Sequence, residues 1–142
     1  MSPYAGGGPV LSVRGRNVGR MEIRIEVVML GVTDPARSRE FYERIGFHID
    51  HDVQVDDATW FIQATPPGSA CSIAFGRGLS PMQPGEQKGI MAVVPDADEA
   101  RQALLEAGVD CTEVDKQAWG RFVSFQDPDQ NAWTYQELPA RG

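Results

Sequence analysis

Residues 32–47 read VTDPARSREFYERIGF, and residues 94–109 read VPDADEARQALLEAGV. In both stretches a glycine follows an aspartate by 12 residues, and the two aspartates, Asp34 and Asp96, are 62 residues apart (96 − 34). Self-similarity at a fixed offset indicates a repeated structural unit. The chain is therefore predicted to contain two copies of one supersecondary module.

Each copy carries the signals of a helix that follows a strand. The two aspartates are typical N-cap residues, and Pro35 stands at a first helical position, where its missing N–H is harmless. Gly46 and Gly108 are typical of left-handed C-terminal caps. Between the caps, small and apolar residues recur at i, i+3, i+4 and i+7, which predicts a helix of about three turns with one inward face. These residues are Ser38, Phe41, Tyr42 and Ile45 in one copy, and Ala100, Ala103, Leu104 and Ala107 in the other.

The same offset continues beyond the helices, through two predicted strands and a turn. It pairs residues 60–62 with 122–124, 65–69 with 127–131, and 71–74 with 133–136. A constant shift over this length predicts two βαβββ modules and an α+β fold. One module is too small to bury a good core. Side by side, the two modules are expected to roll eight strands into a half-open cup, with the helices outside and a ligand site on the inner wall.

The expected boundaries follow from composition. The modules are predicted over residues 21–76 and 89–138, with a linker rich in proline and glycine at 77–88. Residues 1–20 contain a Gly-rich stretch and are expected to form a flexible leader, and residues 139–142 a tail.

Charge and hydropathy exclude several classes of protein. The net charge of −7 and the pI of about 4.7 make nucleic acid an unfavourable partner, because such binding needs clustered Lys and Arg. No apolar run approaches the ~20 residues that a membrane span needs. Residues 1–20 lack the apolar core of a signal peptide. We therefore expect a cytoplasmic protein in which Cys71 and Cys111 are free thiols.

The ordered motifs resemble the vicinal-oxygen-chelate superfamily, which includes glyoxalase I, extradiol dioxygenases, fosfomycin-resistance enzymes and bleomycin-resistance proteins. Residues 32–47 are similar to its first strand–helix segment, including the Phe-Tyr pair and the Gly-Phe exit. Residues 125–131, FQDPDQN, resemble its Asp-Pro-Asp-Gly-Asn turn before the last strand, with Gln130 in place of the usual glycine. The resemblance covers residues 21–138 and implies the paired-module fold.

In the metalloenzymes of that superfamily, four ligands, typically His and Glu from each module, project inward from four strands. Carried over, they fall on Val27, Ser72 (or Ala74 if the register slips by two), Gly89 and Thr134. None of these is a usual ligand, because a divalent metal there prefers imidazole nitrogen or carboxylate oxygen. We therefore predict that this member lacks the metal site and uses no cofactor.

The histidine content of the chain also argues against a metal site. The chain has two histidines, His48 and His51, both in the first module. A site that draws one histidine from each module is therefore impossible. Residues three apart on a strand point to opposite faces, so these two are not expected to chelate a metal together.

Strand alternation predicts a small, apolar inner wall with three uncharged hydrogen-bonding groups, Ser72, Thr134 and Gln136. Trp60 fits the wall and the core equally well, and Trp119 fits either the rim of the cup or a subunit contact. The candidate ligand-binding residues are Val27, Met29, Trp60, Ser72, Ala74, Gly89, Met91, Trp119, Phe122, Thr134 and Gln136.

Three functions fit such a wall. The first is metal-free binding of a small organic molecule, which is sequestered or positioned in the cup; the bleomycin-resistance branch sequesters drugs in crevices between two subunits. The second is a metal-independent isomerase, cyclase or lyase acting on a small natural product, since positioning alone contributes to rate. The third is a metal-dependent lyase or dioxygenase with displaced ligands. Whether the protein is an enzyme stays open. A homodimer is expected from the resemblance and because an open cup leaves sheet edges to be covered.

Overall fold

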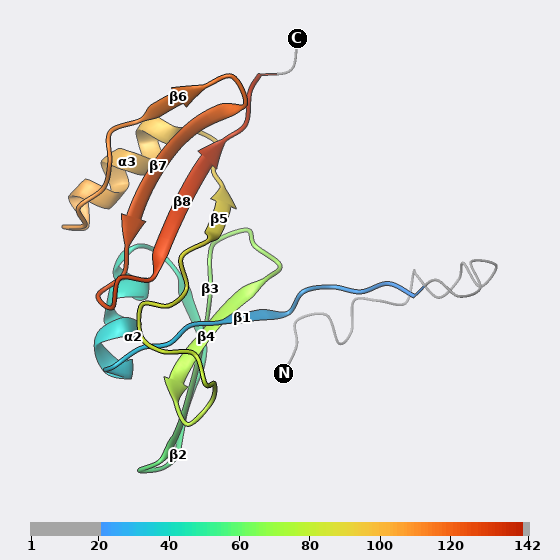
Figure 1. The fold of residues 1–142 in the computed structure, drawn as a ribbon, viewed down its shortest axis with the longest axis vertical. Coiled ribbons are helices and arrows are strands. Elements are labelled where there is room, and N and C mark those ends of the chain that lie inside the picture. The colour runs from blue at the N-terminus through green and yellow to red at the C-terminus, as the bar shows by residue number, and fades with distance from the viewer. Residues whose placement is uncertain (1–20, 141–142) are drawn as a thin grey trace.

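The computed structural model describes residues 21–140, and the predicted leader at 1–20 lies outside this range. The chain forms two successive modules with the same order of elements, as Figure 1 shows. The first contains β1 (Val27–Met29), α2 (Pro35–Arg44), β2 (His48–Asp56), β3 (Thr59–Thr65) and β4 (Ser72–Arg77); the second contains β5 (Ile90–Val93), α3 (Ala97–Glu106), β6 (Asp115–Gln117), β7 (Gly120–Gln126) and β8 (Ala132–Glu137).

Each module contributes one four-stranded sheet. The strand orders are β1-β4-β3-β2 and β5-β8-β7-β6, and the first pair of each sheet is parallel. The predicted α+β class, with two repeated βαβββ modules, is confirmed. Within residues 21–140 the eight strands form two separate sheets, with no strand of one paired to a strand of the other.

The helices begin and end where the sequence indicates. The side chain of Asp34 accepts hydrogen bonds from the backbone N–H groups of Ala36 and Arg37, and that of Asp96 accepts one from Glu99. These bonds satisfy N–H groups that a helix start otherwise leaves without partners. Gly46 follows α2 with a φ of 105°, a left-handed conformation that glycine adopts without steric cost.

One hydrophobic core serves both modules, and α2 lies at its centre. The Tyr42 ring lies 5.5 Å from Phe75 on β4 and 5.9 Å from Trp133 on β8. Trp133 also stacks on Phe125 at 6.0 Å, and it is buried, as expected for a helix-facing residue. Because Tyr42 touches both sheets, their inner sides share this core, and their opposite sides face away from it.

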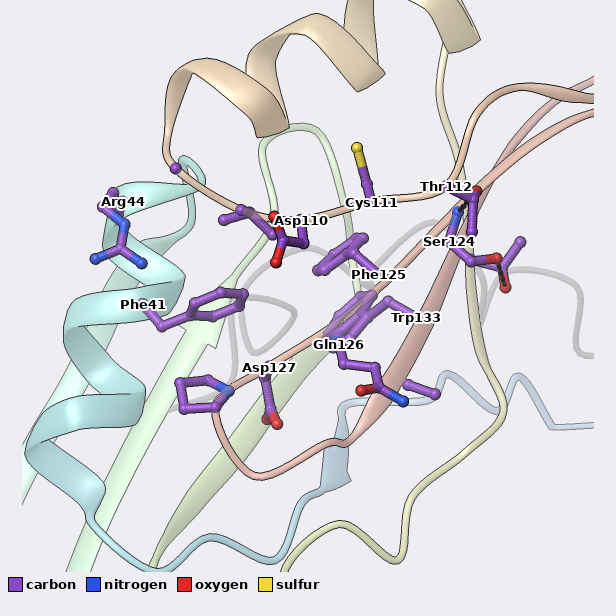
Figure 2. Close-up of a pocket in the computed structure, with 15 residues that line it drawn as sticks. Phe41, Arg44, Asp110, Cys111, Thr112, Ser124, Phe125, Gln126, Asp127 and Trp133 are labelled. Atoms are coloured by element: carbon purple, nitrogen blue, oxygen red, sulfur yellow. Dashed lines mark hydrogen bonds between the residues drawn. The ribbon is translucent and has the colours of Figure 1, made fainter.

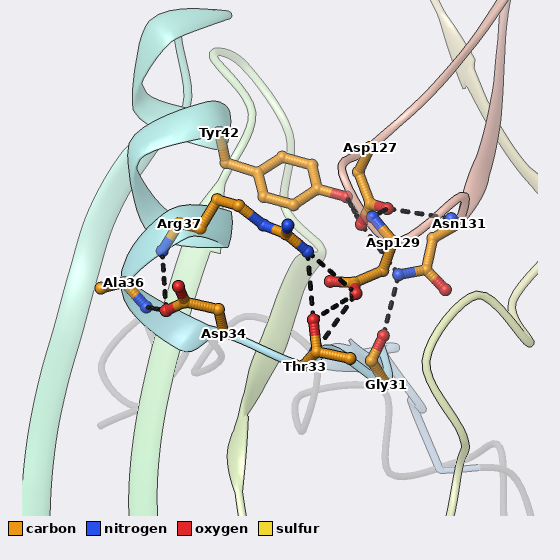
Figure 3. Close-up of polar contacts among 9 residues, drawn as sticks. All are labelled: Gly31, Thr33, Asp34, Ala36, Arg37, Tyr42, Asp127, Asp129 and Asn131. Carbon is orange, nitrogen blue, oxygen red and sulfur yellow. Dashed lines mark hydrogen bonds and ion pairs between the residues drawn. The ribbon is translucent and has the colours of Figure 1, made fainter.

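The turn of residues 127–131 fastens the second module to the first (Figure 3). The Oδ1 atom of Asp129 accepts hydrogen bonds from the Thr33 hydroxyl at 2.7 Å and from the Arg37 guanidinium at 3.2 Å. The Asn131 amide donates to the carbonyl oxygen of Gly31 at 3.0 Å. The Asp129 side chain is nearly buried, so the ion pair with Arg37 compensates a carboxylate that has little contact with water. The motif thus holds the end of β1 against the β7–β8 turn.

Candidate functional site

The sheet of the second module has one side in the core and one exposed side. Ile90 and Ala92 pack against the core, whereas Met91 and Val93 between them are 58% and 61% exposed. Met91 pairs with Thr134 and Val93 with Gln136, so these four side chains share the exposed side. Across β7, Phe122 pairs with Gln136 and Ser124 with Thr134. We call this surface the second open face; it consists of Met91, Val93, Phe122, Ser124, Thr134 and Gln136, with Asp115 of β6 beside Phe122 at its edge.

The sheet of the first module is divided in the same way. Ile73 and Phe75 lie in the core, so Ser72 and Ala74 point to the other side, although both are buried there by their neighbours. Val27 pairs with Ser72, and Gln63 pairs with Ala74. We call this surface the first open face; it consists of Val27, Met29, Phe61, Gln63, Thr65, Ser72 and Ala74, with residues added by β2.

An irregularity in β2 puts both histidines on the first open face. His48 pairs with Thr65 and His51 pairs with Gln63, while Asp50 is the extra residue of a β-bulge. A bulge shifts the alternation by one residue, so side chains three apart in sequence face the same way. The expectation that His48 and His51 point to opposite faces is therefore wrong. Even so, across residues 21–140 no group of three or more His, Cys, Asp or Glu side chains is placed to hold a metal ion.

The bulge also brings a carboxylate to the first open face. The Thr65 hydroxyl donates a hydrogen bond to Oδ2 of Asp50 and lies 2.6 Å from the Ser72 hydroxyl. The Nδ1 atom of His48 lies 3.0 Å from Oδ1 of the same carboxylate. Sequence reasoning found no ionisable group on the wall. It missed Asp50 because strict alternation leaves this residue without an assigned face.

The four positions carried over from the metalloenzymes do not form two matching pairs on the sheets. Thr134 pairs with Met91, while Gly89 lies one residue before β5. The strands β4 and β8 keep the offset of 62, but the residues opposite them on β1 and β5 differ by 64 (91 − 27). With valine, serine, methionine and threonine at the two ladders, the donors do not fit a divalent cation of this superfamily.

The tryptophans occupy different environments. Trp60 packs against the core and donates from its indole Nε1 to Asp52 at 2.6 Å, so the structure places it on the helix side, away from the open face. Trp119 is 63% exposed and immediately precedes β7. The Gln136 amide donates to the Trp119 carbonyl at 3.0 Å, which fixes this part of the rim beside the second open face.

A cavity of about 670 Å³ opens where α2, the segment after α3 and the β7–β8 end meet (Figure 2). Its floor is aromatic, with the nearly buried rings of Phe41, Phe125 and Trp133. Arg44 lies at its edge, with its guanidinium 5.8 Å from the centre of the Phe41 ring. Thr134 is the predicted wall residue that also lines this cavity. The cavity thus borders the second open face.

Cys111 also lines the cavity, and burial is the main reason that the pKa of its thiol is raised. A raised pKa lowers the thiolate fraction at neutral pH, and the thiolate is the nucleophilic form. The same holds for Cys71, and neither cysteine is in a disulfide. These environments do not favour nucleophilic catalysis by either thiol.

A family model described as the glyoxalase/bleomycin resistance protein/dioxygenase superfamily matches residues 24–135. The chain belongs to this superfamily. Within residues 21–140, this superfamily member has no helix that is long and apolar enough to cross a membrane. No curated protein sequence matches it.

Solved structures of this superfamily are similar over most of the chain. One is TnmS3, an antibiotic binding protein from Streptomyces sp. CB03234, with 27% identity and a TM-score of 0.76; the match covers 84% of this chain and all of TnmS3 (100%). Another is a superfamily member from Sphaerobacter thermophilus, with 30% identity and a TM-score of 0.70, over 83% of this chain and 99% of that one. A glyoxalase/bleomycin resistance protein from Streptomyces sp. CB03234 shares 27% identity over 80% of this chain and 100% of its own, with a TM-score of 0.71.

Proposed function

We propose that this protein binds a small organic molecule without a metal ion, in a cup that the first open face of one chain forms with the second open face of another. The observation that carries the proposal is the exposure of Met91 and Val93 on a face whose other side packs against the core. Exposed apolar patches of this kind mark binding surfaces. The similarity to TnmS3, an antibiotic binding protein, supports a natural product as the ligand.

The cup needs a second chain because the hydrophobic core lies between the two sheets of one chain. Tyr42 touches Phe75 of one sheet and Trp133 of the other, so the core lies between the sheets and the two open faces point away from it. One chain therefore cannot bring its own open faces together. A two-fold dimer would pair each open face with the complementary face of the partner and would create two equivalent cups.

Binding without metal is favoured by the chemistry of the walls. Over β5, β7 and β8 the second open face carries a thioether, a phenyl ring, hydroxyls and an amide, which suit an organic ligand. A single carboxylate at its edge, that of Asp115 on β6, is too small a donor set for a divalent cation. Two unpaired cysteines are in keeping with a reducing, cytoplasmic location, which forms part of the proposal.

A metal-independent enzyme is the second candidate, and one observation favours it. The carboxylate of Asp50, linked to Thr65 and Ser72, is a group that could accept a proton from a bound substrate. The two functions differ in outcome, because an enzyme returns its ligand chemically changed.

A binding experiment tests whether the protein binds a small organic molecule and returns it unchanged. A panel of aromatic natural products is titrated while Trp fluorescence is recorded, and each bound compound is then recovered and identified by mass spectrometry. We expect quenching, with exposed Trp119 as the main reporter, and unchanged compounds. Recovery of altered compounds would establish the enzyme instead.

Sedimentation of matched variants tests the shared cup. Met91→Lys places a charge on the second open face, whereas Leu105→Lys places the same charge on the exposed surface of α3. We expect a dimer for the natural protein and for Leu105→Lys, and a monomer with weakened binding for Met91→Lys. A natural protein that sediments as a monomer at micromolar concentration yet binds its ligand fully would disprove the two-chain cup.

A further inference from the structure

We propose that Asp50 is the specificity-determining residue of this cup and binds a protonated amine of the ligand, so that the protein selects an amphipathic organic cation. This inference rests on the proposed function. It starts from the bulge in β2, which places the Asp50 carboxylate on the first open face beside Thr65 and Ser72.

The number of hydroxyl protons determines which group donates in each of these contacts. A threonine hydroxyl has one proton, and that of Thr65 is donated to Asp50. The short contact of 2.6 Å between Thr65 and Ser72 therefore has Ser72 as the donor. Ser72 thus donates to Thr65, and Thr65 donates to Asp50, so the carboxylate is held as an acceptor in one orientation.

The carboxylate keeps capacity for a ligand. An ionised carboxylate has about four acceptor positions, and the two contacts with Thr65 and His48 occupy one position on each oxygen. The Asp50 side chain is 29% exposed, while Ser72 behind it is buried. A ligand would therefore meet the carboxylate before the serine. A charged hydrogen bond to an ammonium group is roughly twice as strong as a neutral one.

The second module shows that the carboxylate is not needed to hold the strands. There, Ser124 and Thr134 form a similar hydroxyl pair at 3.1 Å between the two central strands. The neighbour of that pair is Thr112, whose hydroxyl accepts the backbone N–H of Ser124 at 2.9 Å. The first module keeps the hydroxyl pair and adds Asp50 to it. The carboxylate thus distinguishes the hydroxyl pair of the first module from that of the second, which a structural role does not explain.

The opposite wall defines the rest of the ligand. Over β5, β7 and β8 the second open face is uncharged, with Met91, Val93 and Phe122 as its apolar members, and Asp115 of β6 adds a carboxylate at its edge. In the proposed cup it faces Asp50 of the other chain. A ligand with a planar or aliphatic body and an amine at one end would satisfy both walls, and the overall charge of −7 also favours a cation.

Two probes with the same three-ring frame test this inference. Aminoacridine is a cation at neutral pH, and acridine is neutral. Their affinities for the full-length protein are measured by fluorescence titration. We expect the natural protein to prefer aminoacridine by about tenfold or more, which corresponds to one charged hydrogen bond.

Three variants test which residue causes the preference for aminoacridine over acridine. Asp50→Asn should reduce it to within about twofold while acridine binding is unchanged, because the amide keeps the shape and loses the charge. Thr65→Val should lower the preference in part, because the carboxylate is no longer oriented. Asp57→Asn, in the β2–β3 turn, removes the same charge elsewhere and should keep the preference. Circular dichroism confirms that each variant is folded.

The outcomes separate the two proposals. Acridine binding with no preference for the cation, or equal effects of Asp50→Asn and Asp57→Asn, would overturn the role of Asp50 and leave the cup intact. If neither probe nor any natural product binds, the proposed function itself fails.

Discussion

The Tyr42 hydroxyl donates a hydrogen bond to Oδ2 of Asp127 at 2.8 Å, and this bond links the helix of the first module to the final turn of the second. The same hydroxyl accepts a hydrogen bond from the Trp133 indole at 3.0 Å. All three residues are buried. One oxygen atom of α2 thus satisfies two polar groups that lie 85 and 91 residues further along the chain.

Replacing Tyr42 by phenylalanine should destabilise the protein by about 1–3 kcal/mol, because the Trp133 N–H is then buried without an acceptor. Chemical denaturation measures the loss. Tyr135→Phe is the matched control, since the hydroxyl of Tyr135 has no hydrogen-bond partner within residues 21–140, and a smaller loss is expected. Equal losses for the two variants would show that the hydrogen bonds of Tyr42 contribute nothing beyond the packing of the ring.

Stability should decline at alkaline pH. Burial, together with the neighbouring Asp127 carboxylate, raises the pKa of Tyr42 well above its usual value, and burial raises the pKa of Tyr135 to about 12. An unfolded tyrosine ionises near pH ~10. The stability that these neutral phenols confer is therefore complete below pH ~10 and decreases as the pH rises towards their folded pKa values. Denaturation series at increasing pH would show the decline, and Tyr42→Phe should reduce it. A flat profile in the natural protein would contradict the assigned burial.

Gln130→Gly should stabilise the chain by about 1 kcal/mol, because Gln130 has a φ of 72°, a left-handed conformation that costs a side-chain-bearing residue roughly 1–2 kcal/mol. Gly46→Ala is the reciprocal variant. A Cβ at Gly46 would meet no atom within 4 Å, so its expected loss of about 1 kcal/mol is conformational alone. Thermal denaturation measures both; a lower Tm for Gln130→Gly would mean that the glutamine side chain stabilises the turn by its own contacts.

Treatment with a chelator should leave both the Tm and the affinity for aminoacridine unchanged. The reason is the donor set: Val27 lies beside Ser72 at one parallel ladder and Met91 beside Thr134 at the other, and none of the four is a usual ligand of a divalent metal. Metal analysis of the purified protein accompanies the measurement. Loss of binding that zinc, nickel or iron then restores would reinstate the metal-dependent function.

The repeat and the caps were predictable from sequence because they depend on local chemistry. An aspartate before a helix and a glycine after it satisfy backbone groups in any context, so Asp34, Asp96, Gly46 and Gly108 fix both helices correctly. In β5, the regular alternation places Ile90 and Ala92 in the core and Met91 on the other side, as the structure shows.

The sequence-based predictions were wrong where contacts between separate segments of the chain determine the structure. The bulge at Asp50 accompanies a contact with Thr65, fifteen residues away, and the periodicity of the sequence does not indicate it. The positions carried over from the resemblance included Gly89 and Thr134, but the parallel ladder places Met91 opposite Thr134. Likewise, the direction in which the open faces point depends on how Tyr42 packs between two sheets, which is a property of tertiary packing.

The central position of the Tyr42 ring also affects how the protein unfolds. Since this ring packs on Trp133 of the other half, neither half buries all of its own aromatic residues when separated from the other. Cutting the chain in the 78–89 connection would leave Phe75 packed on Tyr42, but it would expose to water the surfaces of Tyr42 and Trp133 that now cover each other. The duplicated modules behave thermodynamically as one unit, and they should melt in a single cooperative transition.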